Sequence, residues 1–110
     1  MKVRNLKGSH SLTCVCDSWL QHWENNSGKK AENCSVLNCS QKAEVGGHVQ
    51  KRGVSDNNWY IIPICTGCNN KHGQEYEVKE DTGFISVNET SQCGQQLINE
   101  ALIKAGKYTR

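Results

Sequence analysis

The sequence predicts a small α+β domain organised as a zinc-stabilised treble clef. Two cysteine pairs carry this prediction, because their spacings, C-x4-C and C-x2-C, suit the tetrahedral shell of four thiolates that zinc prefers. The segment between the pairs has the pattern of a β-hairpin, and the second pair opens a polar stretch that begins a short helix. A knuckle, a hairpin and a helix that carries the second ligand pair make up a treble clef. The pairs are Cys34/Cys39 and Cys65/Cys68.

The predicted hairpin consists of residues 43–50 and 59–64. The connecting residues, KRGVSDNN, contain the Gly, Asp and Asn that favour a turn. The second strand is a continuous apolar run, so we expect it to be buried on both faces. Pro63 belongs near its end, where a missing backbone donor does least harm.

Flanking elements complete a single domain over residues 1–110. Residues 1–13 have the composition of a basic arm without clear periodicity. A short helix follows, with Asp17 or Ser18 as its N-cap and Asn26 to Gly28 as its end. Its apolar face is formed by Trp19, Leu20 and Trp23.

The C-terminal part is predicted to hold a second hairpin and a last helix. Residues 75–79 and 84–88 alternate in polarity around the turn sequence EDTG. A helix follows with an apolar stripe from Leu97 to Ala105, and Gly106 ends it. The domain is therefore divided into a core (34–72), an N-terminal arm and helix (1–28) and a C-terminal hairpin and helix (75–106).

Composition favours metal binding in a reducing compartment. The chain has 7 cysteines and only 1 Phe, so its core is thin and a metal is expected to add stability. The start, MKVRNLKGSH, lacks the apolar centre of an export signal, and no apolar run approaches a membrane span. We therefore expect a cytoplasmic protein without membrane contact. An odd cysteine number in that setting disfavours two disulfides as the explanation of the pairs.

Three further cysteines suggest a second metal site. Cys14, Cys16 and Cys93 are left over, and His22 is the preferred fourth ligand if the chain ends pack together. Two alternatives stay open. The three thiols are free and buried, or Cys93 forms a disulfide with one of the N-terminal pair.

The core resembles the HNH endonuclease superfamily. His48 in the stretch VGGHV, and the stretch IPICTGCN that ends at Asn69, carry the resemblance, which covers about a third of the chain. That superfamily has a ββα-metal fold, often with a four-cysteine structural zinc. The resemblance implies that His48 is a general base and that Asn69 or His72 contacts a divalent ion such as Mg²⁺ during phosphodiester hydrolysis.

The sequence departs from the superfamily at Gly47, where active members usually have a carboxylate that binds the metal. Two functions therefore stay open. One is a metal-dependent nuclease in which Lys51 and Arg52 hold the nucleic-acid backbone. The other is a catalytically inactive treble-clef module that binds nucleic acid or a protein partner. The net charge of +2 favours few phosphate contacts under either function.

Overall fold

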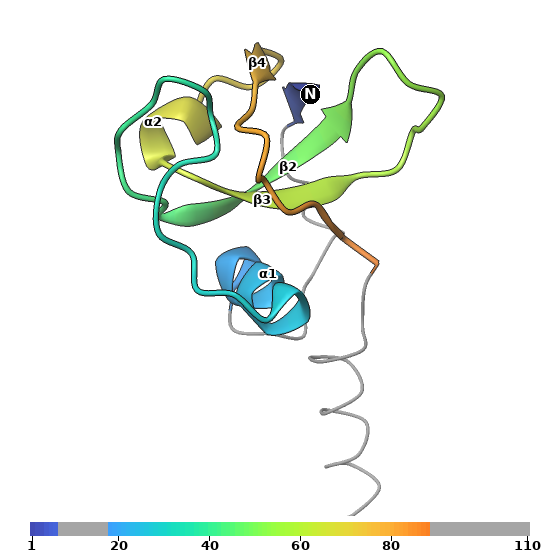
Figure 1. Ribbon diagram of the computed structural model, residues 1–110. Coiled ribbons are helices and arrows are strands. Elements are labelled where there is room, and N and C mark those ends of the chain that lie inside the picture. The colour runs from blue at the N-terminus through green and yellow to red at the C-terminus, as the bar shows by residue number, and fades with distance from the viewer. Residues whose placement is uncertain (7–17, 89–110) are drawn as a thin grey trace, which may run out of the picture.

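The computed structural model describes residues 1–6 and 18–88, and these form an α+β domain with one antiparallel sheet (Figure 1). The sheet has five strands in the order β4-β1-β2-β3-β5. Two helices accompany it. The elements are β1 (Lys2–Leu6), α1 (Trp19–Ser27), β2 (Val45–Lys51), β3 (Tyr60–Ile64), α2 (Thr66–Asn69), β4 (Glu75–Glu77) and β5 (Ile85–Ser86).

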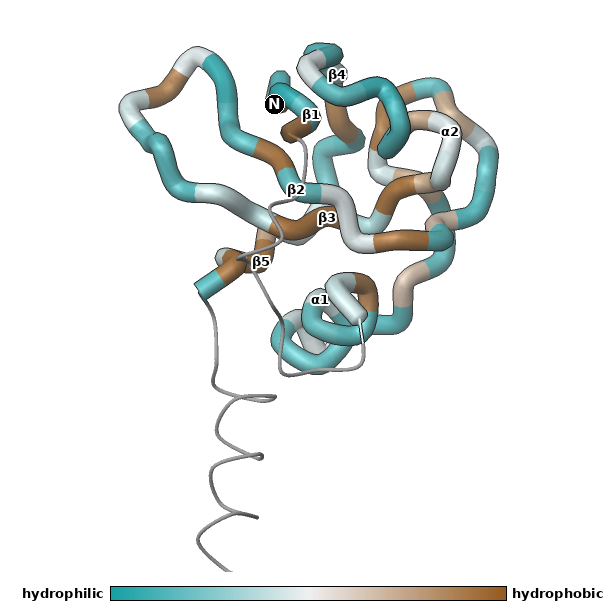
Figure 2. Tube along the Cα trace, turned by 180° about the vertical axis from the view of Figure 1, so that it is seen from behind, coloured by the Kyte–Doolittle hydropathy of each residue, from teal (hydrophilic) through white to brown (hydrophobic). Residues whose placement is uncertain are grey.

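The predicted central hairpin is confirmed. β2 and β3 pair antiparallel from Val45↔Ile64 to Val49↔Tyr60. From Ile61 to Ile64 every residue of β3 is buried, as the unbroken apolar run predicts. Pro63 lies one residue from the end of the strand. Figure 2 shows the apolar residues concentrated along this strand pair.

The prediction of a non-periodic N-terminal arm is wrong for its first residues. β1 lies inside the sheet, between β4 and β2, with Val3 opposite Lys51 on one side and Tyr76 on the other. Its burial alternates, with Val3 and Asn5 fully buried and Lys2 and Arg4 exposed. Because the second inward residue is an asparagine, the apolar alternation that marks a strand is absent from the sequence.

The predicted second hairpin is also wrong. β4 pairs with β1 and β5 pairs with β3, so the two strands form opposite edges of the sheet. Between them, Val78 forms a bridge with Val36. The two strands are only three and two residues long, so tertiary partners and not the intervening turn sequence decide their pairing. The predicted last helix, 97–105, lies outside the described residues.

The two faces of the sheet have different partners, because side chains alternate along each strand. A Cβ on Gly46 would lie 2.6 Å from the carbonyl carbon of Trp19, so this side packs against α1. A Cβ on Gly47 would instead meet Ile64 and Asn69 at the opposite side. We name these sides the α1 face and the cysteine face. Figure 1 shows α1 and α2 on opposite sides of the β2–β3 pair.

The cysteine face holds two small apolar clusters. One joins three strands and the segment after β4; its members are Val3, Val49, Ile62 and Val78, with Tyr60, Tyr76 and Phe84 packed against them. The other surrounds the cysteines and includes Val36 and Ile64. Both clusters are small, which agrees with the thin core expected from composition.

The predicted first helix is confirmed as α1, which covers the other face. The Ser18 side chain accepts a hydrogen bond from the Gln21 amide at 3.0 Å, and Gly28 ends the helix with φ of 71°. The Trp23 indole donates to the Gly83 carbonyl at 2.9 Å, which attaches α1 to the segment before β5. Neither described helix has the length and apolarity that a membrane crossing requires.

Asn5 connects the interior strand β1 to the helix that bears the second cysteine pair. Its side-chain amide lies 3.2, 2.8 and 3.0 Å from the carbonyl oxygens of Cys68, Asn69 and Lys71. These are carbonyls at the end of α2, where intrahelical donors run out. One buried amide therefore holds the end of α2 on β1.

We expect Asn5→Ala to lower the free energy of unfolding by about 1–3 kcal/mol, because it removes the amide donor that three carbonyls share, although those of Cys68 and Lys71 keep other donors. Denaturant titration of the zinc-loaded protein measures this change. Asn57→Ala, at an exposed loop position, is the matched control and should change stability little. Equal midpoints for the two variants would contradict the role given to Asn5.

Candidate metal centre

The four cysteines of the predicted site lie together. Their sulfur atoms are all within 4.8 Å of one another, and Cys39 Sγ is 3.9 Å from Cys65 Sγ. Cys34 and Cys65 are buried, whereas Cys39 and Cys68 are half-buried. Four thiols with these separations are positioned to coordinate a metal ion, and such a donor set is typical of structural zinc. We call this set the cysteine quartet.

A tight turn positions the first pair. The Cys34 amide donates to Gln41 and the Cys39 amide donates to Val36, at 2.9 and 3.1 Å, so the chain folds back directly after Val36. Asn38 has a φ of 67° in this turn, a left-handed conformation that asparagine tolerates better than most residues. The turn brings two sulfurs that are five residues apart onto one side of the backbone.

The second pair lies where β3 passes into α2. Cys65 is the N-cap of α2, and its sulfur accepts a hydrogen bond from the Cys68 amide at 3.4 Å. The hydroxyl of Tyr76 donates to the Cys68 carbonyl at 3.2 Å. The continuous apolar run of β3 therefore carries Cys65 into the core beside the first pair.

The thiols influence one another's protonation. Desolvation raises the pKa of Cys34, and it raises the pKa of Cys68 to about 12 together with effects of the neighbouring thiols. The pKa of Cys65 is lowered, because hydrogen bonds from the Cys68 amide and the neighbouring thiols together outweigh its burial. The thiols of the quartet therefore differ in how readily each one loses its proton. A divalent ion that binds it must displace those protons, so metal binding there depends on pH.

His48 faces away from the quartet. It shares the α1 face with Gly46 and is only 7% exposed. Its ring makes edge contacts with Trp19 and Trp59, with centroids 4.8 and 6.1 Å apart. Burial, and next the neighbouring His22, lower the pKa of His48, and its Nε2 has no hydrogen-bond partner among the described residues.

Asn69 lies on the cysteine face, so the structure does not bring it together with His48. The Asn69 Oδ1 atom is 3.1 Å from the place where a Cβ on Gly47 would lie, and that same Cβ would be 2.7 Å from Ile64 Cγ2. A carboxylate at position 47 therefore requires a shift of the packed isoleucine. His72 follows α2 and is exposed.

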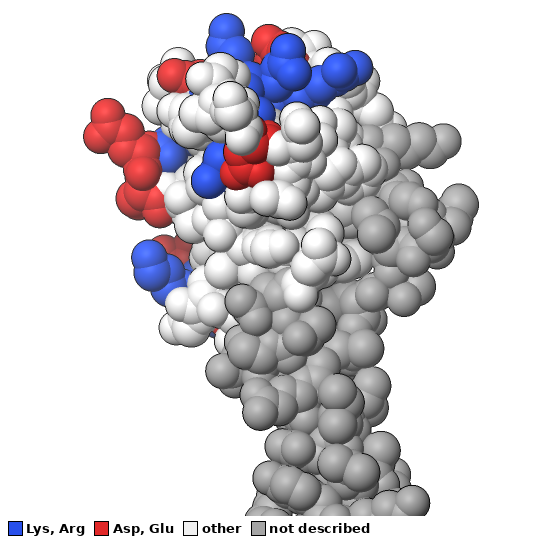
Figure 3. All heavy atoms as spheres, turned by 90° about the vertical axis from the view of Figure 1, so that its right-hand side faces the viewer, with Lys and Arg blue, Asp and Glu red and all other residues white. Residues whose placement is uncertain are grey.

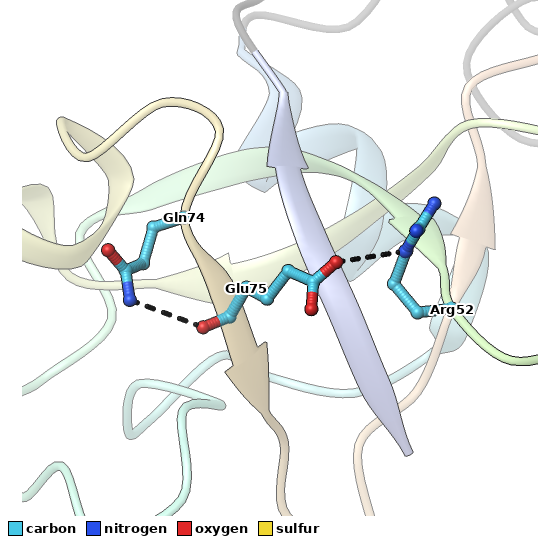
Figure 4. Close-up of polar contacts among 3 residues, drawn as sticks. All are labelled: Arg52, Gln74 and Glu75. Atoms are coloured by element: carbon cyan, nitrogen blue, oxygen red, sulfur yellow. Dashed lines mark hydrogen bonds and ion pairs between the residues drawn. The ribbon is translucent and has the colours of Figure 1, made fainter.

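Lys51 and Arg52, the residues expected to contact a nucleic-acid backbone, lie at the end of β2. The Lys51 ammonium is 4.5 Å from the centre of the Tyr60 ring and 4.9 Å from that of Phe84. Arg52 Nε is 3.0 Å from Glu75 Oε2. Figure 4 shows the Glu75 side chain extending across β1 to reach Arg52.

Three ligands of the predicted second metal site, Cys14, Cys16 and Cys93, lie outside the described residues. The fourth, His22, is buried on α1, and its Nε2 is 3.0 Å from the Ser86 carbonyl. The second site remains a prediction.

Sequence reasoning missed two residues that support the quartet. Asn5 in β1 is far from the cysteines in sequence, whereas Tyr76 in β4 follows Cys68 by eight residues, and both side chains hydrogen-bond to the Cys68 carbonyl. An alternation of apolar and polar residues in β1 could have indicated that Asn5 points inward. Val3 is the one buried apolar residue of that strand, so the alternation cannot be recognised in the sequence.

Comparison with known proteins gives no match: no family model, no curated protein and no solved structure is significantly similar to this chain.

We expect the quartet to bind one zinc ion, with Zn–S distances of roughly 2.3 Å. Replacing any one quartet cysteine with serine should weaken metal binding and lower the melting temperature, since structural zinc contributes roughly 10–16 kcal/mol of apparent binding energy. Elemental analysis, X-ray absorption and thermal melting measure these effects.

Cys93→Ser separates the quartet from the predicted second site. If the second site exists, wild-type protein holds two zinc ions and this variant holds one. A single zinc in the wild type would exclude the second site, and full zinc content in all four quartet variants would exclude the first.

Proposed function

We propose that this chain is a zinc-stabilised treble-clef module that binds nucleic acid without hydrolysing it at His48. Zinc occupancy rests on the quartet. The nucleic-acid partner rests mainly on one observation, the grouping of cationic side chains at one end of the β1–β2 pair. The resemblance to the HNH superfamily gives the same partner class.

The basic cluster consists of Lys2, Arg4 and Arg52. Lys2 and Arg4 alternate with the buried Val3, so they lie on the opposite side of β1, and the Arg52 amide donates to the Lys2 carbonyl at 2.8 Å. Lys51 is the strand partner of Val3 and lies over the Tyr60 and Phe84 rings on the cysteine face, outside this cluster. Figure 3 shows Lys and Arg side chains gathered at this upper end of the molecule. Phosphate oxygens are the natural partners of such a group.

Acidic neighbours leave part of the cluster free for a ligand. Glu75 pairs with Arg52, and Glu77 lies 3.7 Å from the N-terminal ammonium. Within the described part of the chain, Lys2 and Arg4 form no ion pair, although Glu77 and Glu75 are their strand partners. These cations are few and have acidic neighbours, so binding is expected to be weak and dominated by phosphate contacts.

The surroundings of His48 favour binding over hydrolysis. A general base must reach a water molecule beside the scissile phosphate. His48 is almost fully buried beside Trp19, while Asn69 lies across the sheet. These two groups do not meet at one metal ion in this arrangement.

We expect measurable binding of short DNA or RNA at low salt, with log K falling against log salt at a slope of roughly −2 to −4 for double-stranded DNA, from about −0.9 per phosphate contact. The double variant Lys2→Glu/Arg4→Glu should bind more weakly and lose about 0.9 of slope for each lost contact. Fluorescence anisotropy over a salt series measures both quantities.

Lys29→Glu/Lys30→Glu is the control, because it makes the same charge change in the loop after α1. Equal losses in the two double variants would show that only net charge matters. If wild-type protein binds neither DNA nor RNA at low salt, the partner is not nucleic acid.

Plasmid nicking tests the hydrolytic alternative. With Mg²⁺, Mn²⁺ or Ni²⁺ we expect no nicking above a His48→Ala control, because His48 is enclosed by aromatic rings. Nicking by the wild type that falls about 10²–10⁴-fold in His48→Ala, as expected for loss of a general base, would instead identify a nuclease.

A further inference from the structure

Lys79 lies beside the first cysteine pair although it is far away in sequence. Its ammonium donates to the carbonyl oxygens of Cys34 at 2.8 Å and Cys39 at 3.1 Å. Both acceptors belong to ligand cysteines, and they flank the turn that positions the two sulfurs. One cation therefore bridges the two ends of the first ligand pair.

Backbone hydrogen bonds fix the position of Lys79 independently of its side-chain contacts. The segment that follows β4 runs along the first pair: Leu37 donates to the Glu77 carbonyl at 2.8 Å, and Lys79 donates to the Ser35 carbonyl at 2.9 Å. Val36 and Val78 form an antiparallel bridge between these two contacts. The lysine is therefore anchored to the turn on both sides, and ordering its side chain costs less than it would on a loop.

The net charge of a metal-bound quartet would attract the Lys79 ammonium. Four thiolates around one divalent ion carry a net charge of −2, in a site where two of the sulfurs belong to buried cysteines. Coulomb attraction is stronger in such surroundings than in water. Of the side chains that hydrogen-bond to a quartet carbonyl in the described chain, Asn5 and Tyr76 are neutral and only Lys79 is cationic.

Lys79 also stays in contact with water, which allows it to remain charged. It lines an open pocket of about 260 Å³ together with Ser35, Pro63 and Thr82. Glu32 and Asp81 line the same pocket, yet neither forms an ion pair with Lys79. The Lys79 ammonium therefore hydrogen-bonds directly to the carbonyls of two quartet cysteines, which places its positive charge next to the thiolates.

We propose that Lys79 is a positioning residue of the metal centre, which holds the first ligand pair in place and offsets the negative charge of the metal-bound thiolates. This role rests on zinc occupancy of the quartet in the proposed function. It makes the segment after β4 a part of the metal centre, although that segment contains no metal ligand.

Zinc competition with a chromophoric chelator tests this role. Lys79→Met should weaken zinc binding by roughly ten- to a hundredfold, the usual cost of losing a group that supports metal ligands. Lys79→Arg keeps the charge and the donors and should restore affinity to within about threefold, on the same scale of effects. Lys42→Met, at an exposed position close to Cys39 in sequence, is the matched control and should bind zinc as the wild type does.

A second measurement follows the same loss through stability and exchange. In saturating zinc we expect Lys79→Met to melt below the wild type, because a weaker affinity lowers the stabilisation by zinc at every saturating concentration. Its zinc should also be transferred to the chelator faster. Lys79→Gln retains an amide donor without the charge, and serves if the methionine variant does not fold.

Wild-type zinc affinity in both neutral variants would overturn the role of Lys79, as would an arginine variant that binds as weakly as the methionine variant. Failure of the proposed function looks different, because the wild-type protein itself would then take up no zinc.

Discussion

The convergence of four thiols within 4.8 Å is the constraint on which the rest of this domain depends. The first pair is brought together by a tight turn and the second by the junction of β3 and α2, and the β2–β3 hairpin spans the sequence between them. Apolar burial alone is small here, in two clusters. Bound zinc typically contributes about as much free energy as the whole net stability of a small domain, so a zinc ion held by these thiols would dominate the stability of the fold.

Remote segments then hold each half of the quartet. Asn5 of β1 supports the end of α2, and Lys79 supports the first pair from the segment after β4. Both groups bind backbone carbonyls and leave the sulfurs free. This arrangement connects the quartet to β1 and to the segment that follows β4, so polar contacts add to a small apolar core in a five-stranded sheet.

The parts of the fold that the sequence could predict are those encoded locally. Cysteine spacing indicated the quartet, the apolar run indicated β3, and the Ser18 and Gly28 signals bounded α1. β1 was missed because its second inward position is Asn5, whose burial depends on carbonyls more than sixty residues away. The pairing of β4 and β5 with opposite sheet edges could not be predicted either, since three- and two-residue strands carry too little alternation to specify a partner.

The candidate site shows the same limit. The order of His48 and Asn69 along the chain favoured one shared site, but strand alternation decides which face each residue occupies. Gly46 and Gly47 carry the decisive information, because each faces a neighbour too close for a side chain. Glycine patterns of this kind become informative only when the packing is known.

The interior position of β1 has a consequence for how the sheet assembles. β1 lies between β2 and β4, and both of these strands come much later in the sequence. Pairing over such long separations is slow, because the intervening chain must first be closed into a loop. Until β1 pairs, the β2–β3 hairpin has an open edge at β2. An open strand edge of this kind readily accepts other extended segments, so the partly folded protein is most exposed to mispairing before β1 joins the sheet.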